Sequence, residues 1–501
     1  MLTSQALHAG ASRSARWAVL QSVGKQGIDL LVFLLLARLV APQAFGLVAM
    51  AAGIVVLVTV ISEMGLGDAL IQKAELSGVD LDTAFWAAVG IGLSCTCVLL
   101  VSAPFAASLY HHPELAEILR ALSPLFLFAS LNLVPQALLQ RDLAFKPLAL
   151  RALAGSLLGG LSGTAVAVAG GGAWAMVTQQ LVSALVGLAG LWYMSPWRPQ
   201  FKFSRASART LYAFSSHVLG ARTLNVLASK ADDLAVGLVL GPLALGFYSI
   251  ACRLLLALEQ IFCQGVDAVA LSALSRAGSS RDEMRAIFRK ATSTAALWAF
   301  PVFGGAIALA PEVIALLVGP TWAPSVPLLQ ILLVAGLLHS VMHFNHAVFK
   351  ACGRPEITMR IALASTLLNV VTLVIALQFG IEAVAISYVA RTALLGPVGV
   401  QLACRMVGLS LADYAKGLIR PALCFAVALG ALVLCRSWLG TPSPDFFHLG
   451  VHLAVEVFAS AASYAASWAL SGLILPAPAA RPSPASQAAA PADSPGKTAI
   501  G

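Results

Sequence analysis

The residues of this sequence best suited to chemistry are charged side chains that stand inside long apolar segments. Four basic residues are of this kind: Arg222, Lys230, Arg253 and Arg391. A charge at the centre of a membrane-spanning helix costs about 2.5–3.5 kcal/mol on insertion scales, so such residues persist where they face water, a partner or a substrate. They therefore mark candidate interior surfaces of a membrane protein.

The segment 210–240 carries the longest polar pattern. Its polar residues follow i, i+3, i+7 and i+10 or i+11 spacing, which places them on one helix face. They are Arg222, Asn225, Ser229, and Asp232 or Asp233, with Lys230 at the margin. A stripe of cations and carboxylates is poorly suited to lipid, so it is expected to line a water-filled cavity.

Two further apolar segments carry charges. Lys25 and Asp29 stand four residues apart in the first segment, which permits an ion pair on one helix face. The eighth segment adds Glu259 and Asp267 to Arg253. For each residue by itself, a structural ion pair and a role toward substrate both remain open. The set as a whole predicts a polar lumen.

Histidines and cysteines give weaker signals. His339, His343 and His346 fall on one helix face at i, i+4 and i+7, which is compatible with a proton relay or a metal site. No acidic residue accompanies them, so a polar patch is the favoured interpretation. The eight cysteines are scattered through apolar runs and predict no metal site. Motifs of ATP hydrolysis, serine hydrolases and zinc proteases do not occur.

The composition shows what kind of element must carry these charges. Of 501 residues, 59% are hydrophobic and 11% are charged, whereas a soluble domain carries about 25% charged residues. The bilayer must therefore be the solvent for most of the chain. The net charge of +9 is spread singly between apolar runs, without the basic stripe of a nucleic-acid-binding protein. Nucleic acid is thus excluded as a partner.

Apolar runs long enough to cross a bilayer, about 20 residues each, predict an all-α polytopic membrane protein with about fourteen helices. The runs are 17–40, 44–62, 84–108, 120–139, 150–170, 173–194, 210–240, 244–270, 291–318, 326–349, 358–379, 382–404, 417–439 and 448–475. The connecting loops are too short for a soluble domain. Residues 476–501, rich in Pro, Ala and Ser, predict a disordered tail.

The distribution of Lys and Arg predicts the orientation. Basic residues concentrate in alternate loops, and the opposite side holds only Arg38, Arg120 and Arg436. Because cytoplasmic loops carry the excess of Lys and Arg, both termini are expected in the cytoplasm. The first segment follows the polar, basic residues 1–16 without a cleavage pattern, so it is expected to remain as a span.

The sequence contains a weak internal repeat. Residues 37–51 and 237–251 align at a shift of 200, with Pro42, Ala44 and Gly46 meeting Pro242, Ala244 and Gly246. Gly172-Ala-Trp-Ala175 and Gly380-Ile-Glu-Ala383 align at a shift of 208. These matches predict two related six-helix halves of the same orientation. The Pro-x-Ala-x-Gly stretch is interpreted as a tight outer turn, with a hinge of an outer gate as the alternative.

The predicted organisation is two parallel six-helix lobes around a central cavity plus a C-terminal helix pair. The boundaries are 1–16 for the cytoplasmic N-terminus, 17–200 and 201–410 for the two lobes, 411–475 for the extra pair, and 476–501 for the cytoplasmic tail.

Several stretches resemble the bacterial polysaccharide (O-antigen type) flippases, in particular the branch for exopolysaccharides such as colanic acid. They are Glu63-Met-Gly-Leu-Gly-Asp-Ala-Leu-Ile-Gln72 with Thr83-Ala-Phe-Trp86, Gln140-Arg-Asp-Leu-Ala-Phe145, Gly172-Ala-Trp-Ala175 with Gln179 and Gln180, and Lys230-Ala-Asp-Asp-Leu234 leading into Leu240-Gly-Pro-Leu-Ala-Leu-Gly-Phe-Tyr248. The resemblance covers about residues 15–440. It implies the two-lobed fold of the multidrug/oligosaccharidyl-lipid/polysaccharide exporter superfamily.

The resemblance also implies a substrate, an undecaprenyl-pyrophosphate-linked oligosaccharide moved from the cytoplasmic to the periplasmic leaflet of the bacterial inner membrane. Cations in the lumen would replace water around the pyrophosphate. The residues expected to bind the pyrophosphate or the sugar are Arg222, Lys230, Arg253, Lys25, Asn225 and Arg391. Asp232, Asp233, Asp29 and Glu259 are expected to tune these cations or to carry a coupling proton. No resident cofactor or metal is expected, although proton or sodium coupling stays open. Expected partners are membrane lipids, a polysaccharide polymerase and other assembly proteins.

Three other functions compete with this interpretation. A drug/cation antiporter of the same superfamily would be expected to need dominant intramembrane carboxylates, whereas this predicted lumen is mixed and mildly cationic. A membrane polysaccharide polymerase or glycosyltransferase would need a sizeable outer loop with catalytic groups, and the outer loops here are short. A non-transporting scaffold would leave the polar stripe unexplained. The sequence therefore predicts a transporter and not an enzyme.

Overall fold

The computed structural model describes residues 4–63, 65–73, 75–276, 281–439 and 446–474, and within these ranges every regular element is a helix. Thirteen of the described helical stretches are long and apolar enough to cross a membrane. The predicted all-α polytopic membrane protein is thus confirmed. The first eight helices are α1 (Ser4–Leu39), α2 (Pro42–Glu63), α3 (Leu66–Gln72), α4 (Gly78–Leu109), α5 (Glu114–Leu122), α6 (Pro124–Arg141), α7 (Phe145–Val168) and α8 (Ala173–Met194).

After α9 (Arg205–Arg276), the remaining elements are shorter on average. They are α10 (Arg281–Ala299), the π-helix η1 (Phe300–Gly304), α11 (Gly305–Ala308), α12 (Ala310–Leu317), η2 (Pro320–Trp322), α13 (Ser325–Met342), α14 (Asn345–Ala351), α15 (Pro355–Ala376), η3 (Leu377–Phe379), α16 (Ile381–Val407), α17 (Leu411–Leu439) and α18 (Phe446–Ile474). The predicted span 291–318 begins earlier, at Arg281, and its crossing part ends at Ala308. α12 follows as a separate short helix.

Helix α9 joins two predicted spans across a break. Gly241 has φ 82° and ψ 178°, a conformation that glycine adopts without steric cost. Pro242 follows, and its ring removes a backbone N–H from the helical hydrogen bonds. The apolar stretch Val226–Ile261 runs across this break and is counted once among the thirteen. Because this one stretch holds parts of two predicted spans, thirteen stretches agree with about fourteen predicted spans.

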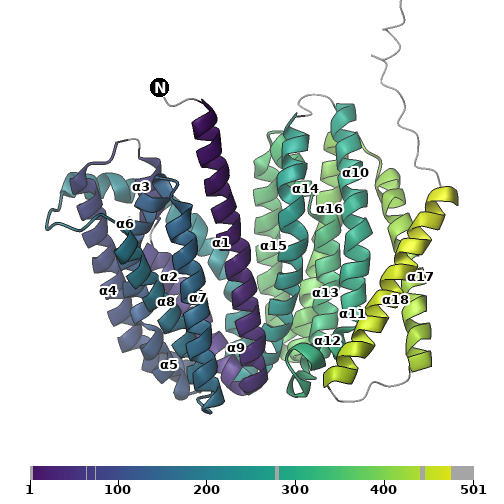
Figure 1. Cartoon of the computed structure of the whole chain (residues 1–501), viewed down its shortest axis with the longest axis horizontal. Helices are drawn as coiled ribbons and strands as arrows, with labels where there is room; N and C mark the ends of the chain where they lie inside the picture. Colours follow the sequence, from purple (N-terminus) through teal and green to yellow (C-terminus); the bar gives the residue numbers. More distant parts are fainter. Residues whose placement is uncertain (1–3, 64, 74, 277–280, 440–445, 475–501) are drawn as a thin grey trace, which may run out of the picture.

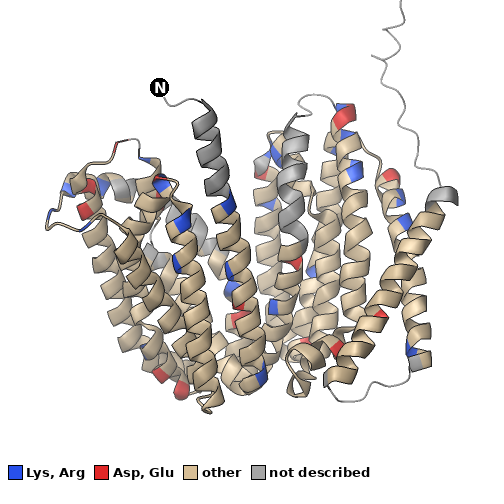
Figure 2. Ribbon diagram, in the orientation of Figure 1, with Lys and Arg blue, Asp and Glu red and all other residues tan. Residues whose placement is uncertain are grey.

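The helices form two groups side by side, α1–α8 in one and α10–α18 in the other (Figure 1). α1 begins and α18 ends at the same end of the bundle. Most Lys and Arg residues of the described chain gather at that end (Figure 2), as expected for a cytoplasmic side. The grouping resembles the predicted lobes, whose exact boundaries stay a prediction.

At the opposite end, the two repeated Pro-x-Ala-x-Gly stretches pack against each other. A Cβ atom added at Gly46 would lie 1.7 Å from the carbonyl oxygen of Pro242, and one added at Gly246 would lie 2.2 Å from that of Pro42. The two glycines therefore allow the backbones of α2 and α9 to touch in a reciprocal arrangement. The repeat forms a contact between the halves as well as a turn.

A buried tryptophan extends this contact. The indole of Trp322 is fully buried, and its Nε1 donates to the carbonyl oxygen of Ala37 at 2.7 Å. The rings of Phe45 and Phe247 lie 5.5 and 6.0 Å from it, edge to face, a favourable aromatic geometry. Arg38 donates to the carbonyl oxygens of Leu316 and Leu317. Together with the glycine contact, these residues hold the two groups closed at this end.

Candidate functional site: a polar cavity between the first helix group and α9

A cavity of about 570 Å³ lies between α1, α2, α6, α8 and α9. Its apolar wall includes Phe33, Leu36 and Phe45, which belong to the large core that closes the end of the bundle. Its polar lining is drawn from α1, α8 and α9: Lys25, Asp29, Gln179, Gln180, Ser183, Lys230, Asp233, Ser249 and Arg253. The structure thus brings five of the predicted site residues, Lys25, Asp29, Lys230, Asp233 and Arg253, to one cavity.

Each half of the cavity contributes a Lys–Asp ion pair. The predicted pair of Lys25 with Asp29 forms on α1, and the Lys230 Nζ lies 2.7 Å from Asp233 Oδ2 on α9. The ammonium groups keep much of their surface exposed, since the Lys25 and Lys230 side chains are 47% and 37% accessible. An anion that enters the cavity can therefore reach both lysines without first breaking a buried pair.

Arg253 is the cation of this cavity with least compensation. Its guanidinium lies over the Phe33 ring, 5.2 Å from the centroid, an arrangement that favours a cation. It makes no ion pair with any residue that the structure describes. Three cations and two carboxylates line the cavity, so the lining has a net charge of +1 at neutral pH. The mildly cationic lumen expected from the sequence is consistent with this arrangement.

The remaining predicted residues lie elsewhere or are not described. The side chains of Arg222, Asn225 and Asp267 lie outside the described residues. Asp232 is not part of the cavity lining, and it accepts a hydrogen bond from Asn369 Nδ2 on α15 at 2.9 Å. Arg391 on α16 stacks over the Tyr388 ring, 5.0 Å from its centroid.

Glu259 and the histidines require two corrections. Glu259 Oε1 lies 3.0 Å from Nδ1 of His339, so the expectation that no acidic group accompanies the histidines is wrong. The partner comes from α9, 80 residues away in sequence, where spacing gives no signal. The three histidines also do not share one continuous helix, because α13 ends at Met342 and α14 begins at Asn345. Among the described residues no cluster of three His, Cys, Asp or Glu side chains could hold a metal ion.

The sequence did not predict Gln179 and Gln180 as site residues, although both line the cavity. They are part of the stretches that resemble the flippase family. Their helix, α8, is held close to α7 by glycines at every fourth position. Added Cβ atoms at Gly155, Gly159 and Gly163 would lie 2.9, 2.7 and 2.8 Å from α8 carbonyl oxygens. Small residues at this spacing allow close helix packing in membranes. Here they bring the α8 amides to the cavity wall.

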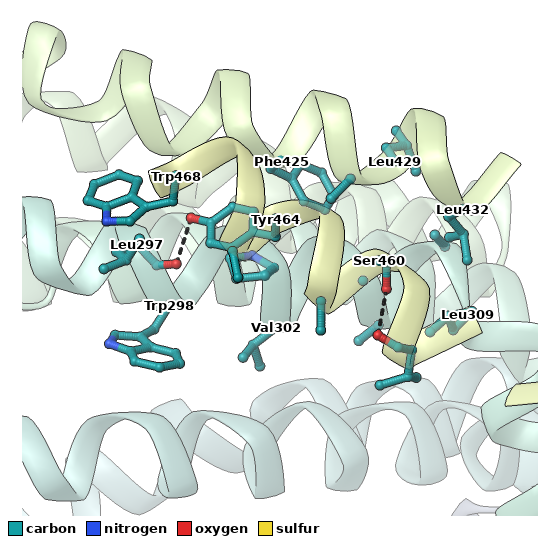
Figure 3. Close-up of a pocket in the computed structure, with 18 of the residues that line it drawn as sticks. Leu297, Trp298, Val302, Leu309, Phe425, Leu429, Leu432, Ser460, Tyr464 and Trp468 are labelled. Atoms are coloured by element: carbon teal, nitrogen blue, oxygen red, sulfur yellow. Dashed lines mark hydrogen bonds between the residues drawn. The ribbon is translucent and has the colours of Figure 1, made fainter. Parts of the chain in front are cut away.

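A second, larger cavity of about 650 Å³ lies where α17 and α18 pack on α10–α12 (Figure 3). Its lining is aromatic and aliphatic and includes no charged residue. The Tyr464 hydroxyl donates its hydrogen to the carbonyl oxygen of Leu297 at 2.7 Å. This cavity offers no charged group to an anionic ligand, so the polar cavity is the candidate site.

Comparison with known proteins places this architecture in a family. Residues 35–327, more than half of the chain, match the model of a family described as "Polysaccharide biosynthesis protein". The chain belongs to this family. The predicted resemblance to polysaccharide flippases is thereby confirmed at the level of the family.

Curated relatives of this family member have names from the same field. Teichuronic acid biosynthesis protein TuaB of Bacillus subtilis is 27% identical over 90% of this chain and 93% of its own length. Succinoglycan biosynthesis transport protein ExoT of Rhizobium meliloti is 29% identical over 64% of this chain and 65% of its own. Lipopolysaccharide biosynthesis protein WzxC of Escherichia coli is 25% identical over 72% of this chain and 74% of the other. The chain is thus a multi-pass membrane protein related to proteins of polysaccharide biosynthesis and transport.

Solved structures agree on the fold. The lipid II flippase MurJ in an inward closed conformation superposes with a TM-score of 0.71 at 15% identity, over 92% of this chain and 99% of MurJ. An inward-facing multidrug transporter of the MATE family gives a TM-score of 0.59 at 16% identity, over 76% and 94%. At this identity the likeness concerns the fold alone, and that fold is one of membrane transporters.

Proposed function

We propose that this protein is a flippase that moves an undecaprenyl-pyrophosphate-linked oligosaccharide across the bacterial inner membrane for exopolysaccharide or lipopolysaccharide synthesis. The observation that carries the proposal is the polar cavity between the first helix group and α9, which is lined by Lys25, Lys230 and Arg253. Family membership and the transporter fold support the same conclusion. In this account the protein forms and breaks no covalent bond.

The cavity chemistry suits a lipid pyrophosphate. The pyrophosphate carries a compact negative charge whose hydration must be replaced when it leaves the headgroup region. Arg253 offers a planar fork of donors that matches phosphate oxygens. Lys25 and Lys230 can turn from Asp29 and Asp233 toward the phosphate, since each pair is partly exposed. The amides of Gln179 and Gln180 provide donors and acceptors for sugar hydroxyls.

The closed end suits an alternating-access cycle. The glycine contact and Trp322 hold the two helix groups together at one end, and the end rich in Lys and Arg lies opposite. If that basic end is cytoplasmic, both termini lie in the cytoplasm and the closed end faces the periplasm. Substrate then enters from the cytoplasmic leaflet and leaves after the closed end separates. The lipid tail remains in the bilayer throughout.

Complementation in cells tests the proposal. In a strain that lacks the chromosomal copy, we expect the double variant Arg253→Gln/Lys230→Gln to abolish surface polysaccharide and to accumulate lipid-linked oligosaccharide. Each charge-assisted contact is worth about 1.5–3 kcal/mol, or roughly 10–150-fold in affinity. Arg209→Gln, a surface control on α9, should restore full polymer. If the double variant also restores full polymer, the cavity does not bind the pyrophosphate. A fall in drug resistance with unchanged polymer would favour the drug antiporter instead.

A further inference from the structure

Three polar side chains from three helices form a network beside the polar cavity. His339 on α13 contacts Glu259 on α9 through Nδ1 at 3.0 Å and Thr392 on α16 through Nε2 at 3.3 Å. The Thr392 residue is 9% exposed and the Glu259 side chain 19%. Both ring nitrogens of His339 are therefore engaged, and each has a partner from a different helix.

The hydrogen bonds of this network depend on how many protons it holds. A threonine hydroxyl has a single hydrogen, and the Thr392 hydroxyl lies 2.9 Å from the carbonyl oxygen of Tyr388, which can only accept. If Thr392 donates to that carbonyl, it must accept from Nε2–H of His339. The contact between Nδ1 and the Glu259 carboxylate then needs a second proton, on Nδ1 or on the carboxyl group. In this arrangement the His–Glu pair is neutral overall.

Loss of one proton has a defined alternative. A neutral imidazole with its proton on Nδ1 donates to the Glu259 carboxylate and leaves Nε2 as an acceptor. The Thr392 hydroxyl then rotates from the Tyr388 carbonyl to Nε2. The network has changed by one proton and one unit of charge, and each contact of the His339 ring still joins a donor to an acceptor. The Thr392 hydroxyl can thus satisfy the His339 ring in both protonation states by rotating about its Cβ–Oγ1 bond.

The network has a route to the cavity along α9. Cys252 and Leu256 line the cavity, and Glu259 follows them at i+7 and i+3, on the same helix face. Other titratable and charged groups close to the network belong to the same helices. The Tyr388 ring on α16 lies 5.8 Å from the His339 ring, and the Arg391 guanidinium lies 5.0 Å from the Tyr388 ring.

The other elements packed on α13 add few charges. His343 follows one turn later, directly after the end of α13, and Tyr414 of α17 donates to the carbonyl oxygen of Val341 at 3.3 Å. α10, η1 and α11 carry no charged residue from Ala291 to Ala308. Glu312 on α12 is paired with Arg436. α14 adds His346 and Lys350. Glu259 is therefore the acidic group in direct contact with His339.

We propose that Glu259, His339 and Thr392 form a proton-binding site, separate from the anion-binding cations, that couples proton movement to the transport cycle. The proposal rests on the proposed flippase function for its role, but the site itself does not. Helices α9, α13 and α16, which are far apart in the sequence, meet at this network. A change in their relative position therefore breaks one of its contacts. Such a break changes the proton affinity of the site between conformations, which is what coupling requires.

Transport in proteoliposomes tests the coupling. The purified full-length protein is reconstituted with a trapped pH-sensitive dye and with lipid-linked oligosaccharide extracted from a strain that lacks this protein. We expect an imposed pH gradient to accelerate transport by the wild-type protein. We also expect transport to move protons, which the trapped dye reports. His339→Asn, Glu259→Gln and Thr392→Val should lose this acceleration, while Thr392→Ser retains it. Thr366→Val, which removes a helix-internal hydroxyl on α15, serves as the matched control. Unchanged acceleration in the first three variants would overturn the proposal.

A second measurement separates this proposal from the proposed function. Magnetic resonance of ¹⁵N-histidine in lipid nanodiscs reports the protonation of His339 without any substrate, with assignment by His339→Asn. Glu259→Gln removes the carboxylate that contacts Nδ1 at 3.0 Å, so we expect it to move the ¹⁵N resonances of the His339 ring, whereas Thr366→Val should leave them in place. His339 resonances that Glu259→Gln does not move would refute the site. A shift without transport by the wild type would refute the flippase and leave the site standing.

Discussion

The contact between the two repeated glycine turns makes a strong prediction about the outer gate. In Gly46→Ala, the new Cβ would lie 1.7 Å from the Pro242 carbonyl oxygen and 2.5 Å from its carbon. Both are backbone atoms, so no side chain can rotate away. Overpacking of this kind costs about 1–3 kcal/mol. The cost falls on the closed arrangement alone, because the two backbones separate when the gate opens. The open population should rise by roughly 5–150-fold.

Labelling from outside the cell measures this shift. A single cysteine replaces Ser249, which lines the cavity two turns beyond the α9 break, in a variant whose eight native cysteines are replaced. We expect Gly46→Ala and Gly246→Ala each to speed labelling by a membrane-impermeant maleimide. Gly90→Ala is the control, since no atom lies within 4 Å of its added Cβ. If both gate variants label at the rate of Gly90→Ala, the glycine contact is not the gate.

Two other predictions concern stability. Gly159→Ala would place its Cβ 2.7 Å from the Gln179 carbonyl oxygen, so it should lower the free energy of unfolding by about 1–3 kcal/mol. This loss should appear as a lower thermal unfolding midpoint in nanodiscs, whereas Gly187→Ala, with open space around it, should leave the midpoint unchanged. Arg436→Gln should cost about 1–3 kcal/mol, because it leaves the 3% exposed Glu456 without its ion pair. Lys416→Gln breaks only an exposed pair and should change the midpoint little; equal midpoints for the two variants would contradict this.

Hydropathy and local spacing predicted the features that depend on neighbours in sequence. The spans follow from the bilayer, which requires apolar helices of a minimum length. The Lys25–Asp29 pair follows from their i, i+4 spacing on one helix. The polar stripe of α9 includes Asp233, which lines the cavity, but its spacing could not separate Asp233 from Asp232, whose partner Asn369 lies on another helix.

Contacts between distant segments could not be predicted in the same way. The repeat identified Gly46 and Gly246 as equivalent, but not that each packs against the other's turn, because equivalence says nothing about docking. Glu259 and His339 meet only after α9 and α13 have packed. The amides of α8 reach the cavity because of glycines on α7. The glycines of α7 do recur at every fourth position, but that spacing does not say which helix packs against them. The contact of Glu259 with His339 leaves no periodic signal in either sequence segment alone.

The central claim is that the polar cavity carries a lipid-linked oligosaccharide by its pyrophosphate. The most direct test is flipping of this substrate by the purified protein in proteoliposomes, read by a membrane-impermeant enzyme that cleaves only glycans exposed outside. The account predicts that wild-type protein makes internal glycan accessible and that Arg253→Gln/Lys230→Gln slows this by at least tenfold, while Arg209→Gln does not. Equal rates for the double variant and wild type would contradict it.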